Sequence, residues 1–380
     1  MSCYRAFKSE KIVIFHLIKS LGRGGAEILL PETLRLHDRE RFRFAYGYFL
    51  DYKNQVVPEL ESLGATVHCF GANRPHQILL QARAVARYAQ RIGAHLIHAH
   101  LPLAGLAARL AGRMAGIPVI YTEHNMQERY HVLTRWANAR TLPWCSRVLG
   151  VSNEVTASIL RHVKRPVHVT TLLNGVNTER FNPALFNRLE LRNRLGIEAR
   201  TPVIGTVAVF REQKRLTDWL LLAQSVKNYL PDARFILIGD GPQEFLLKAK
   251  AEELGMGNCV YFPGRLPEVR PWLAAMDVFV MTSAFEGLPL AMLEAMSMEL
   301  PIAATAVGGV AEVVRHEKEG FLAPKDEPQK LLENLLMLLQ NDEKRMQMGK
   351  AARIRVVNDF SIERMAKELE TVYRSVIAEA

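Results

Sequence analysis

Residues 278–296 read VFVMTSAFEGLPLAMLEAM, a stretch that combines a strand, a loop and a helix. Its first five residues form a short apolar run, typical of a strand buried in a parallel sheet. Gly287 then relaxes the backbone, and Pro289 suits the first turn of a helix. The stretch therefore predicts one strand–loop–helix unit, the repeating element of an α/β fold.

The same alternation of apolar runs and helical segments extends through most of the chain. The intervening segments of about 15 residues can each hold the crossover helix that parallel strands require. In the first half, strands are predicted at 12–17, 42–49, 66–70, 95–99, 118–122, 148–151 and 167–172. In the second half they are predicted at 203–209, 234–239, 259–262, 278–282 and 302–305. From Pro328 onward only helices are predicted, with breaks around Asn341 and near Ser361, which is a good N-cap. The pattern predicts an α/β fold with two parallel, Rossmann-like sheets.

Length and composition also favour two globular domains. The 380 residues exceed one ordinary domain, and 49% hydrophobic residues can bury a substantial core. A loop with Asn174, Gly175 and Asn177 ends at Pro183 and places a hinge near residue 180, so we expect domains at 1–180 and 181–359. No apolar run approaches the ~20 residues that span a bilayer, and the N-terminus lacks a signal-peptide core. We therefore expect a cytoplasmic protein.

The charge of the chain is unevenly distributed. The net charge is +10, but residues 1–180 carry 24 Lys and Arg against 12 Asp and Glu, whereas residues 181–380 carry 25 against 27. This asymmetry indicates that the first half meets an anionic partner, which charge alone leaves open between nucleic acid, a membrane surface and a phosphorylated ligand.

The loop around Glu286 is the strongest candidate site. Open α/β sheets bind ligands at the carboxyl ends of their strands. Glu286 can accept hydrogen bonds from sugar hydroxyls, and Glu294, more than a turn inside the following helix, can reach a ribose. The helix amides between them can bind a diphosphate. The arrangement favours a sugar nucleotide over the alternative of an ordinary amphipathic helix.

Three other loops carry candidate residues. Lys214, in the basic segment 211–215, suits a phosphate beside a helix N-terminus, although a solvated basic face is the alternative. Gly24 and Gly25 permit close backbone approach, but Glu27 stands where a dinucleotide fingerprint needs Gly or Ala, which leaves an anion, a sugar or a plain tight turn. His124 lies in a polar loop after a strand and is a candidate functional histidine.

No metal site is expected from ligand spacing. His98 and His100 project from the same face of a strand, but no third ligand follows at suitable spacing, which favours packing or cleft lining. The cysteines are far apart and are expected to be reduced thiols: Cys3, Cys69, Cys145 and Cys259.

Together these residues resemble glycosyltransferase family four, retaining enzymes of GT-B fold, over almost the whole chain. The family's two glutamates separated by seven residues are similar to Glu286 and Glu294, and its nucleotide-domain lysine is similar to Lys214. Its glycine loop resembles residues 24–27, its cleft histidine resembles His124, and its interdomain linker resembles residues 174–177. The resemblance implies two domains that face a cleft, with residues 360–380 forming a helix that crosses back to the N-terminal domain.

The resemblance also implies roles for individual residues. Lys214 would bind the donor diphosphate, Glu294 the ribose and Glu286 the sugar, with Glu286, Lys214 and His124 as the catalytic set. The implied ligand-binding residues are Gly24, Gly25, Arg211, Lys214, Gly264, Arg265, Leu266, Glu286, Gly287, Leu288 and Glu294. Many family members carry an arginine where this chain has Val209, so either Arg211 or Arg215 compensates or the phosphate is held less tightly.

The implied activity is transfer of a sugar from a nucleotide-sugar donor, UDP-linked, to a hydroxyl acceptor with retention of configuration, in cell-surface glycan or glycolipid biosynthesis. The acceptor would be a sugar, a lipid-linked group or a small molecule, and neither a cofactor nor a metal is expected. Two alternatives stay open: a sugar-nucleotide epimerase or phosphorylase of the same fold, and a non-catalytic protein that binds membranes or nucleic acid. Because no nucleic-acid motif accompanies the charge, we expect no nucleic-acid partner.

A basic stripe suggests an anionic membrane surface as a further partner. Arg83, Arg87 and Arg91 are spaced four apart, with apolar neighbours at residues 78–80 and 85. A second segment mixes arginine with large aromatics: Arg129, Tyr130, Arg135, Trp136, Arg140, Trp144 and Arg147. These predict peripheral binding at the inner face of the plasma membrane, with a solvated helix face as the alternative.

Overall fold

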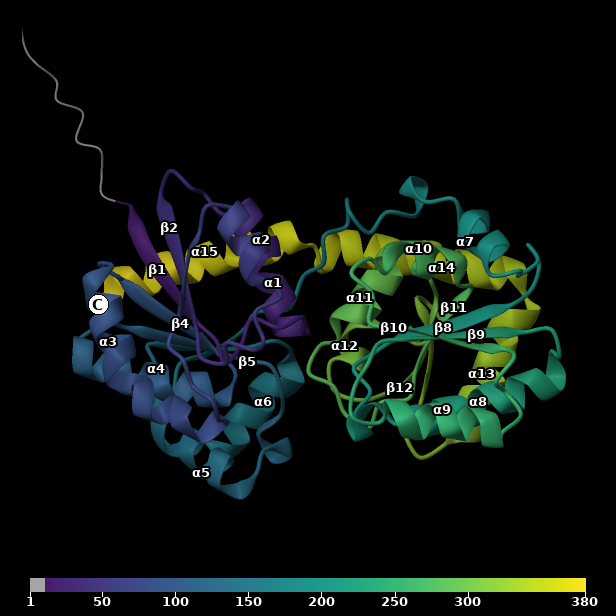
Figure 1. The fold of residues 1–380 in the computed structure, drawn as a ribbon, viewed down its shortest axis with the longest axis horizontal. Helices are drawn as coiled ribbons and strands as arrows, with labels where there is room; N and C mark the ends of the chain where they lie inside the picture. Colours follow the sequence, from purple (N-terminus) through teal and green to yellow (C-terminus); the bar gives the residue numbers. More distant parts are fainter. Residues whose placement is uncertain (1–10) are drawn as a thin grey trace, which may run out of the picture. The chain divides into compact units, whose positions relative to one another are not determined.

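The structure is a computed structural model that describes residues 11–380, and these divide into two compact units. The N-terminal unit is the chain up to Leu172 together with Met365–Ala380, and the C-terminal unit is Leu173–Arg364. Each unit is built on one parallel sheet flanked by helices (Figure 1). The predicted α/β fold with two parallel, Rossmann-like sheets is confirmed.

The division between the units lies a few residues from the positions expected from the sequence, at 172/173 and 364/365 rather than near 180 and 360. Hydrogen bonds explain the difference. Asn174 Nδ2 donates to the carbonyl of Leu288 at 3.1 Å, and the amide of Val176 donates to the carbonyl of Phe360 at 2.9 Å. These contacts tie the linker to the C-terminal unit.

The N-terminal sheet has seven parallel strands in the order β3-β2-β1-β4-β5-β6-β7. The first strand along the chain lies inside the sheet, because the chain adds β2 and β3 on one side of it and β4 to β7 on the other. The register sets His16 of β1 directly beside His98 of β4. The strands are β1 (Ile12–Leu17), β2 (Phe42–Tyr48), β3 (Thr66–Cys69), β4 (Leu96–His100), β5 (Val119–Glu123), β6 (Arg147–Gly150) and β7 (Val169–Thr171).

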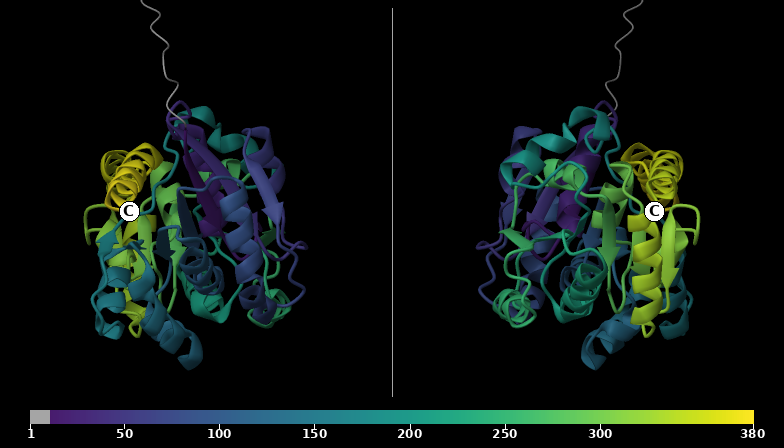
Figure 2. Two further views of the ribbon diagram at one scale, coloured as in Figure 1. Left: turned by 90° about the vertical axis from the view of Figure 1, so that its left-hand side faces the viewer. Right: turned by 90° about the vertical axis from the view of Figure 1, so that its right-hand side faces the viewer.

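Helices cover both faces of this sheet. They are α1 (Gly25–Leu36), α2 (Val57–Ser62), α3 (Ala82–Arg91), α4 (Pro102–Ala115), α5 (Val132–Thr141), α6 (Asn153–His162) and the last helix, α15 (Ile362–Glu379). In Figure 2, α15 (yellow) lies on one side of the purple and blue strands, and blue helices lie on the other. From Met365 onward α15 belongs to the N-terminal unit, as the resemblance implied.

The C-terminal sheet has six parallel strands in the order β10-β9-β8-β11-β12-β13. They are β8 (Val203–Val207), β9 (Arg234–Ile238), β10 (Val260–Gly264), β11 (Val278–Met281), β12 (Ile302–Thr305) and β13 (Gly320–Ala323). The sequence predicted five of them and missed β13. Only four residues long and preceded by charged residues, β13 shows little apolar pattern, and it forms because β12 offers a free edge to pair with.

The helices of the C-terminal unit are α7 (Arg188–Arg194), α8 (Leu216–Tyr229), α9 (Glu244–Glu253), α10 (Arg270–Ala275), α11 (Leu290–Ser297), α12 (Val310–Val313), α13 (Pro328–Gln340) and α14 (Asp342–Asp359). The predicted breaks are confirmed. Asn341 caps α14 by accepting from the amide of Lys344 at 2.9 Å, and Ser361 precedes α15 and accepts from the amide of Arg364 at 3.2 Å.

Two further sequence expectations concern cysteines and membrane spans. Cys69, Cys145 and Cys259 are free thiols, whereas Cys3 lies outside the described residues. Across residues 11–380, none of the helices combines the length and apolar character that crossing a membrane requires.

Candidate active site

Lys214 and Glu286 meet at the carboxyl end of the C-terminal sheet. Lys214 ends a short 3-10 helix (Glu212–Lys214) after β8, and Glu286 lies in the loop between β11 and α11. Lys214 Nζ lies 2.6 Å from Glu286 Oε1, and the hydroxyl of Ser283 donates to the same oxygen at 2.5 Å. Glu286 is only 4% exposed. A buried carboxylate is thus held by one ammonium group and one hydroxyl.

Hydrogen bonds to backbone carbonyls tie the two loops together. The amide of Ala284 donates to the carbonyl of Gln213 at 2.8 Å, and Gln213 Nε2 donates back to the carbonyl of Phe285 at 2.9 Å. The hydroxyl of Thr282 donates to the carbonyl of Lys214 at 3.1 Å. The contact between Lys214 and Glu286 is therefore built on a rigid frame rather than on two mobile side chains.

Gly308 and Gly309, in the loop after β12, pack directly against the Glu286 loop. Gly308 has φ +50°, and a Cβ there would lie 2.0 Å from the carbonyl oxygen of Glu286. The amide of Gly309 donates to the carbonyl of Gly287 at 2.9 Å. The sequence shows glycines at a strand end, but it does not reveal that they support Glu286, because that depends on the adjacency of β11 and β12.

The basic residues beside Lys214 face different surroundings. The guanidinium of Arg215 lies 2.5 Å from Asp218 and donates to the carbonyl of Lys325 at 2.9 Å. Among residues 11–380, no side-chain hydrogen bond or ion pair involves Arg211, which is exposed, as is Val209. Arg211 is thus the more available cation near Lys214.

The remaining predicted residues of this unit lie at neighbouring strand ends. Gly264 ends β10, and its carbonyl accepts from the amide of Gly239 at 3.0 Å. Arg265 NH1 lies 3.9 Å from Asp240 Oδ2, and Leu266 follows in the same loop. Glu294 is a half-buried residue of α11, and Gly287 directly follows Glu286. The side chain of Leu288 is buried, so its backbone is the part that can meet a ligand.

The other predicted residues lie in the N-terminal unit. Gly24 is the N-cap of α1, and Gly25 is its first residue. A Cβ at Gly24 would lie 2.5 Å from Glu27 Oε2, so glycine leaves room there for the side chain of Glu27. His124 follows β5 and is half-buried.

Glu123, which the sequence showed only as part of a polar loop, holds His124 in place. It is fully buried, and its Oε1 accepts from the amides of His124 at 3.0 Å and Asn125 at 3.2 Å. Tyr121 and Tyr130 donate their hydroxyls to the same carboxylate. Burial raises the pKa of Glu123, and these hydrogen bonds oppose that shift.

His98 and His100 have a third imidazole beside them, contrary to the sequence argument about spacing. His16 comes from β1, and the nearest nitrogen atoms of the three rings lie within 4.8 Å of one another. Counting along the chain misses a ligand that a neighbouring strand supplies. Burial lowers the pKa of His98 to about 3 and also lowers the pKa of His16 and His100.

The two basic segments differ in how many of their apolar residues are exposed to solvent. Arg83, Arg87 and Arg91 are exposed on α3, but their expected neighbours Ile78 and Val85 are buried. Of the expected apolar neighbours, Leu79 and Leu80 are exposed.

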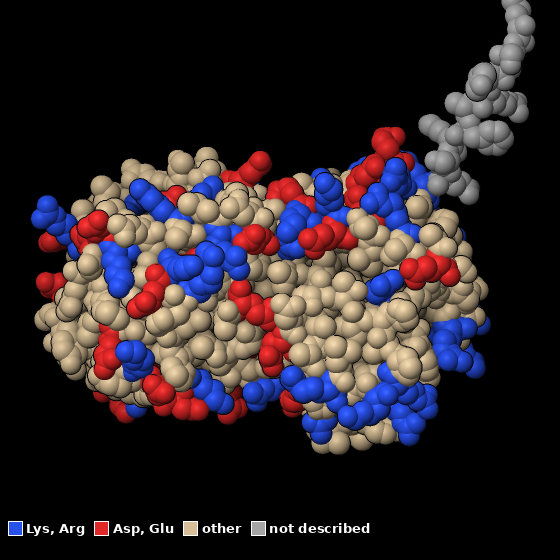
Figure 3. Space-filling view, turned by 180° about the vertical axis from the view of Figure 1, so that it is seen from behind, with Lys and Arg blue, Asp and Glu red and all other residues tan. Residues whose placement is uncertain are grey.

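Helix α5 exposes more apolar surface than the basic stripe does. Leu133 is 70% exposed and Trp136 60%, with Arg140 5.8 Å from the Trp136 ring. Tyr130 instead contacts buried Glu123. Lysine and arginine gather over the lower right of Figure 3, at the end of the N-terminal unit that carries α5.

Two family models match the chain, one for each half. The model "Glycosyltransferase Family 4" matches residues 13–180, and the model "Glycosyl transferases group 1" matches residues 187–355. The second match contains Lys214, Glu286 and the glycines that support them.

Relatives and solved structures agree with this assignment. The D-inositol 3-phosphate glycosyltransferase of Thermobispora bispora is 30% identical over 74% of this chain and 71% of its own. The UDP-Gal:alpha-D-GlcNAc-diphosphoundecaprenol alpha-1,3-galactosyltransferase of Escherichia coli is 27% identical over 74% and 76%. The Anabaena protein HepE, solved with UDP-glucose, superposes with a TM-score of 0.85 at 22% identity over 96% of this chain and 100% of its own. The chain belongs to the group 1 glycosyl transferases of GT-B fold, the family 4 type.

Proposed function

We propose that the protein transfers a sugar from a UDP-linked donor to a hydroxyl acceptor, with retention of anomeric configuration. The observation that carries this proposal is the 2.6 Å contact between Lys214 and buried Glu286 at the carboxyl end of the sheet. A cation for a diphosphate and a carboxylate for sugar hydroxyls stand side by side there, at the edge where parallel sheets bind ligands.

In the proposed reaction, the bond between the sugar C1 and the diphosphate oxygen breaks, and a bond from the acceptor oxygen to C1 forms on the same face. The acceptor proton passes to an oxygen of the departing diphosphate. Lys214 and the N-terminal amides of α11 stabilise the charge that develops on that group. Glu286 orients the donor sugar, and Glu294 binds the ribose.

Arg211 is the proposed second cation for the diphosphate. Arg215 is engaged by Asp218 and by the carbonyl of Lys325, whereas Arg211 is exposed without such a contact among the described residues. On this proposal, Arg211 takes the part that an arginine at position 209 plays in many family members.

The relatives support the choice of donor and acceptor classes. HepE was solved with UDP-glucose, and the name of the Escherichia coli relative specifies UDP-Gal and a diphosphoundecaprenol acceptor. We therefore place a UDP-sugar first among donors and a lipid-linked hydroxyl first among acceptors, in glycan or glycolipid biosynthesis.

A lipid-linked acceptor would bring the protein to an anionic membrane surface on the cytoplasmic side. The exposed residues Leu133 and Trp136 of α5, with Arg140 beside them, suit the boundary between headgroups and acyl chains. The arginine stripe of α3 would add electrostatic attraction.

The test is a panel of UDP-, GDP- and ADP-sugars, each incubated with the full chain while release of the nucleoside diphosphate is followed. We expect release from a UDP-sugar, undiminished by a chelator, because no metal is proposed beside the diphosphate. With an acceptor, NMR of the product should show the anomeric configuration of the donor.

Each alternative has its own signature in the same assay. Conversion of the donor to an epimeric UDP-sugar would favour an epimerase, and sugar phosphate formed with inorganic phosphate as acceptor would favour a phosphorylase. Turnover lost in chelator and restored by magnesium would contradict the metal-free mechanism. Inverted products would contradict retention.

A further inference from the structure

A run of hydrogen-bonding side chains crosses the core of the N-terminal unit. Thr122 Oγ1 lies 2.7 Å from His98 Nε2, and His98 Nδ1 lies 2.8 Å from the hydroxyl of Tyr373 in α15. The same hydroxyl lies 3.3 Å from His16 Nε2. Four elements, β1, β4, β5 and α15, thus share one set of polar contacts in a buried place.

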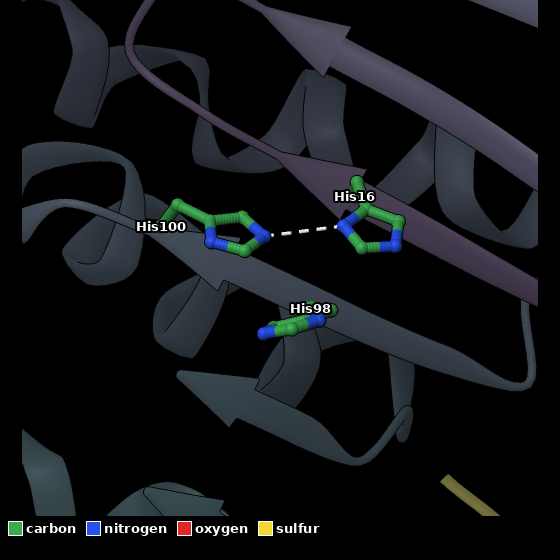
Figure 4. A group of neighbouring side chains, drawn as sticks. All are labelled: His16, His98 and His100. Atoms are coloured by element: carbon green, nitrogen blue, oxygen red, sulfur yellow. Dashed lines mark hydrogen bonds between the residues drawn. The ribbon is translucent and has the colours of Figure 1, made fainter. Parts of the chain in front are cut away.

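The run continues from β1 to the loop after β5. His16 Nδ1 lies 3.1 Å from His100 Nε2, the contact drawn in Figure 4, and His100 Nδ1 lies 3.4 Å from His124 Nε2. We call the whole run the imidazole chain; it consists of Thr122, His98, Tyr373, His16, His100 and His124. Of its members, His124 is the half-exposed end.

Little water can reach the imidazole chain. Its histidines line a cavity of about 20 Å³, which has room for roughly one water molecule. Leu29 and Leu30 of α1 and Met365 and Leu369 of α15 form its apolar walls. The donors and acceptors of the imidazole chain must therefore pair mainly with one another.

The geometry favours a hydrogen-bonded chain over a metal site. Both nitrogens of His98 already contact Thr122 and Tyr373. Its ring also packs against the other two, with centroids 4.9 Å from His16 and 4.3 Å from His100. A lone pair of His98 is thus not directed at the space between His16 and His100.

The imidazole chain allows only two directions of hydrogen-bond donation. Burial favours neutral imidazoles, and a neutral imidazole has one N–H donor and one acceptor nitrogen. If one histidine donates through Nδ1, the next must accept through Nε2 and donate through Nδ1 in turn. One end therefore determines the tautomer of every member.

Thr122 decides the direction. Within residues 11–380, His98 Nε2 is its hydroxyl's one hydrogen-bond partner. If donation along the imidazole chain ran toward Thr122, its hydroxyl would accept from His98. The hydroxyl proton would then be buried without a partner, at a cost of about 1–3 kcal/mol. Donation from Thr122 to His98 avoids that cost.

We propose that the imidazole chain holds His98, His16, His100 and His124 as Nδ1–H tautomers and so makes the remaining nitrogen of His124 a hydrogen-bond donor. Neutral His124 would then offer an N–H to a ligand oxygen instead of a basic nitrogen. His98, His16, His100 and Tyr373 act as positioning residues. That consequence for catalysis rests on the proposed function, whereas the tautomers do not.

The tautomers can be read by NMR of the full chain labelled with ¹⁵N histidine, near pH 7.5, without any substrate. Long-range proton–nitrogen spectra distinguish Nδ1–H, Nε2–H and cationic rings. We expect Nδ1–H for all four histidines. An Nε2–H or cationic form at His16, His98 or His100 would overturn the proposal, whether or not the protein proves to be a transferase.

Two substitutions at His100 test the coupling to His124. The amide nitrogen of His100→Asn lies near the position of Nδ1 and can still donate, so His124 should stay Nδ1–H. His100→Leu removes the donor, and His124 should show a mixture with Nε2–H. His68→Asn, outside the imidazole chain, is the matched control for the loss of a ring. Equal tautomers of His124 in the Asn and Leu variants, with the remaining spectrum preserved, would overturn the coupling.

Zinc provides a second check. Addition of one equivalent of Zn²⁺ should leave the Nδ1–H signals in place. Their stoichiometric loss, with nitrogen shifts of bound metal at His16, His98 and His100, would replace the hydrogen-bonded chain with a metal site.

Discussion

Lys214 and Glu286 show what single residues contribute. They are 72 positions apart, yet Nζ and Oε1 lie 2.6 Å apart because β8 and β11 are neighbours in the sheet. The carboxylate is buried, so removal of either partner leaves the other in a place where few groups can replace it. Mutations here should therefore affect activity far more than those at exposed ion pairs.

We expect Lys214→Ala and Glu286→Gln each to lower turnover by about 10²-fold or more, because each removes a group that we propose contacts the reacting donor. Steady-state kinetics with the UDP-sugar selected from the panel measures the effect. Lys248 and Glu244 form an exposed pair at 2.7 Å in the same unit, and Lys248→Ala and Glu244→Gln are the matched controls. Near-normal turnover in folded Lys214 and Glu286 variants would contradict the site assignment.

Gly308→Ala should impair activity through the Glu286 loop. The added Cβ would lie 2.0 Å from the carbonyl oxygen of Glu286, so this loop must shift. Gly255 has φ +66°, but a Cβ added there would have no atom within 4 Å, so Gly255→Ala separates backbone strain from the clash. We expect both variants to lose about 1 kcal/mol of stability from positive φ, and only Gly308→Ala to lose turnover as well. Equal turnover in the two would argue against support of Glu286 by Gly308.

At the scale of elements, burial separates two helices that look alike in sequence. Both α3 and α5 carry arginines near apolar residues, but the packing of α3 buries Ile78 and Val85. Helix α5 leaves Leu133 and Trp136 exposed. Apolar groups that are already buried cannot enter a membrane, and beside α3 only Leu79 and Leu80, which precede the helix, are exposed. Helix α5 is therefore the better candidate for insertion, and α3 itself contributes mainly charge.

Vesicle flotation tests this distinction. Leu133→Gln with Trp136→Gln should weaken binding to anionic vesicles at any salt concentration, because apolar burial is lost. Changing Arg83, Arg87 and Arg91 to Gln should weaken binding mainly at low salt, by up to about 1 kcal/mol for each charge. Exposed Phe245 and Leu246 of the other unit, changed to Gln, serve as the control pair. Binding unaffected by both sets of changes, or absent at low salt, would reject a membrane role for these helices.

At the scale of the whole molecule, buried imidazoles connect stability to pH. Burial lowers the pKa of His98 to about 3 and lowers that of His16 and His100, so these rings stay neutral in the folded unit. An unfolded chain takes up their protons below about pH 6.5, and protons bound only by the unfolded state favour unfolding. The contribution of these neutral imidazoles to the free energy of unfolding is complete above about pH 6.5. It falls as the pH decreases toward the folded pKa values.

Each such histidine should therefore lower the free energy of unfolding by about 1.4 kcal/mol for each pH unit below its unfolded pKa. Calorimetry between about pH 8 and 4.5 should show a falling Tm; in this window the carboxyl groups with lowered pKa, such as Asp277 and Glu370, add little. His98→Asn should reduce the slope of the free energy of unfolding against pH by the amount that corresponds to about one proton. The same change at exposed His76 should leave this slope unchanged. A Tm independent of pH over this range would contradict neutral burial.

Sequence patterns alone predicted the two parallel sheets, most strand positions, the helix breaks at Asn341 and Ser361, and the family to which the chain belongs. These follow from local signals: apolar period, turn residues, caps and short motifs around Lys214 and Glu286. Local signals were too weak for β13, whose four residues pair only because β12 has a free edge.

The tertiary structure was needed to show which distant residues meet. Strand adjacency brings Gly308 beneath Glu286 and His16 beside His98, and α15 supplies Tyr373 to an imidazole chain assembled from β1, β4 and the end of β5. Burial, too, is a property of packing, and it separates α5 from α3 and keeps the imidazoles neutral. Contacts between residues tens to hundreds of positions apart depend on strand order and helix docking, which no window of sequence encodes.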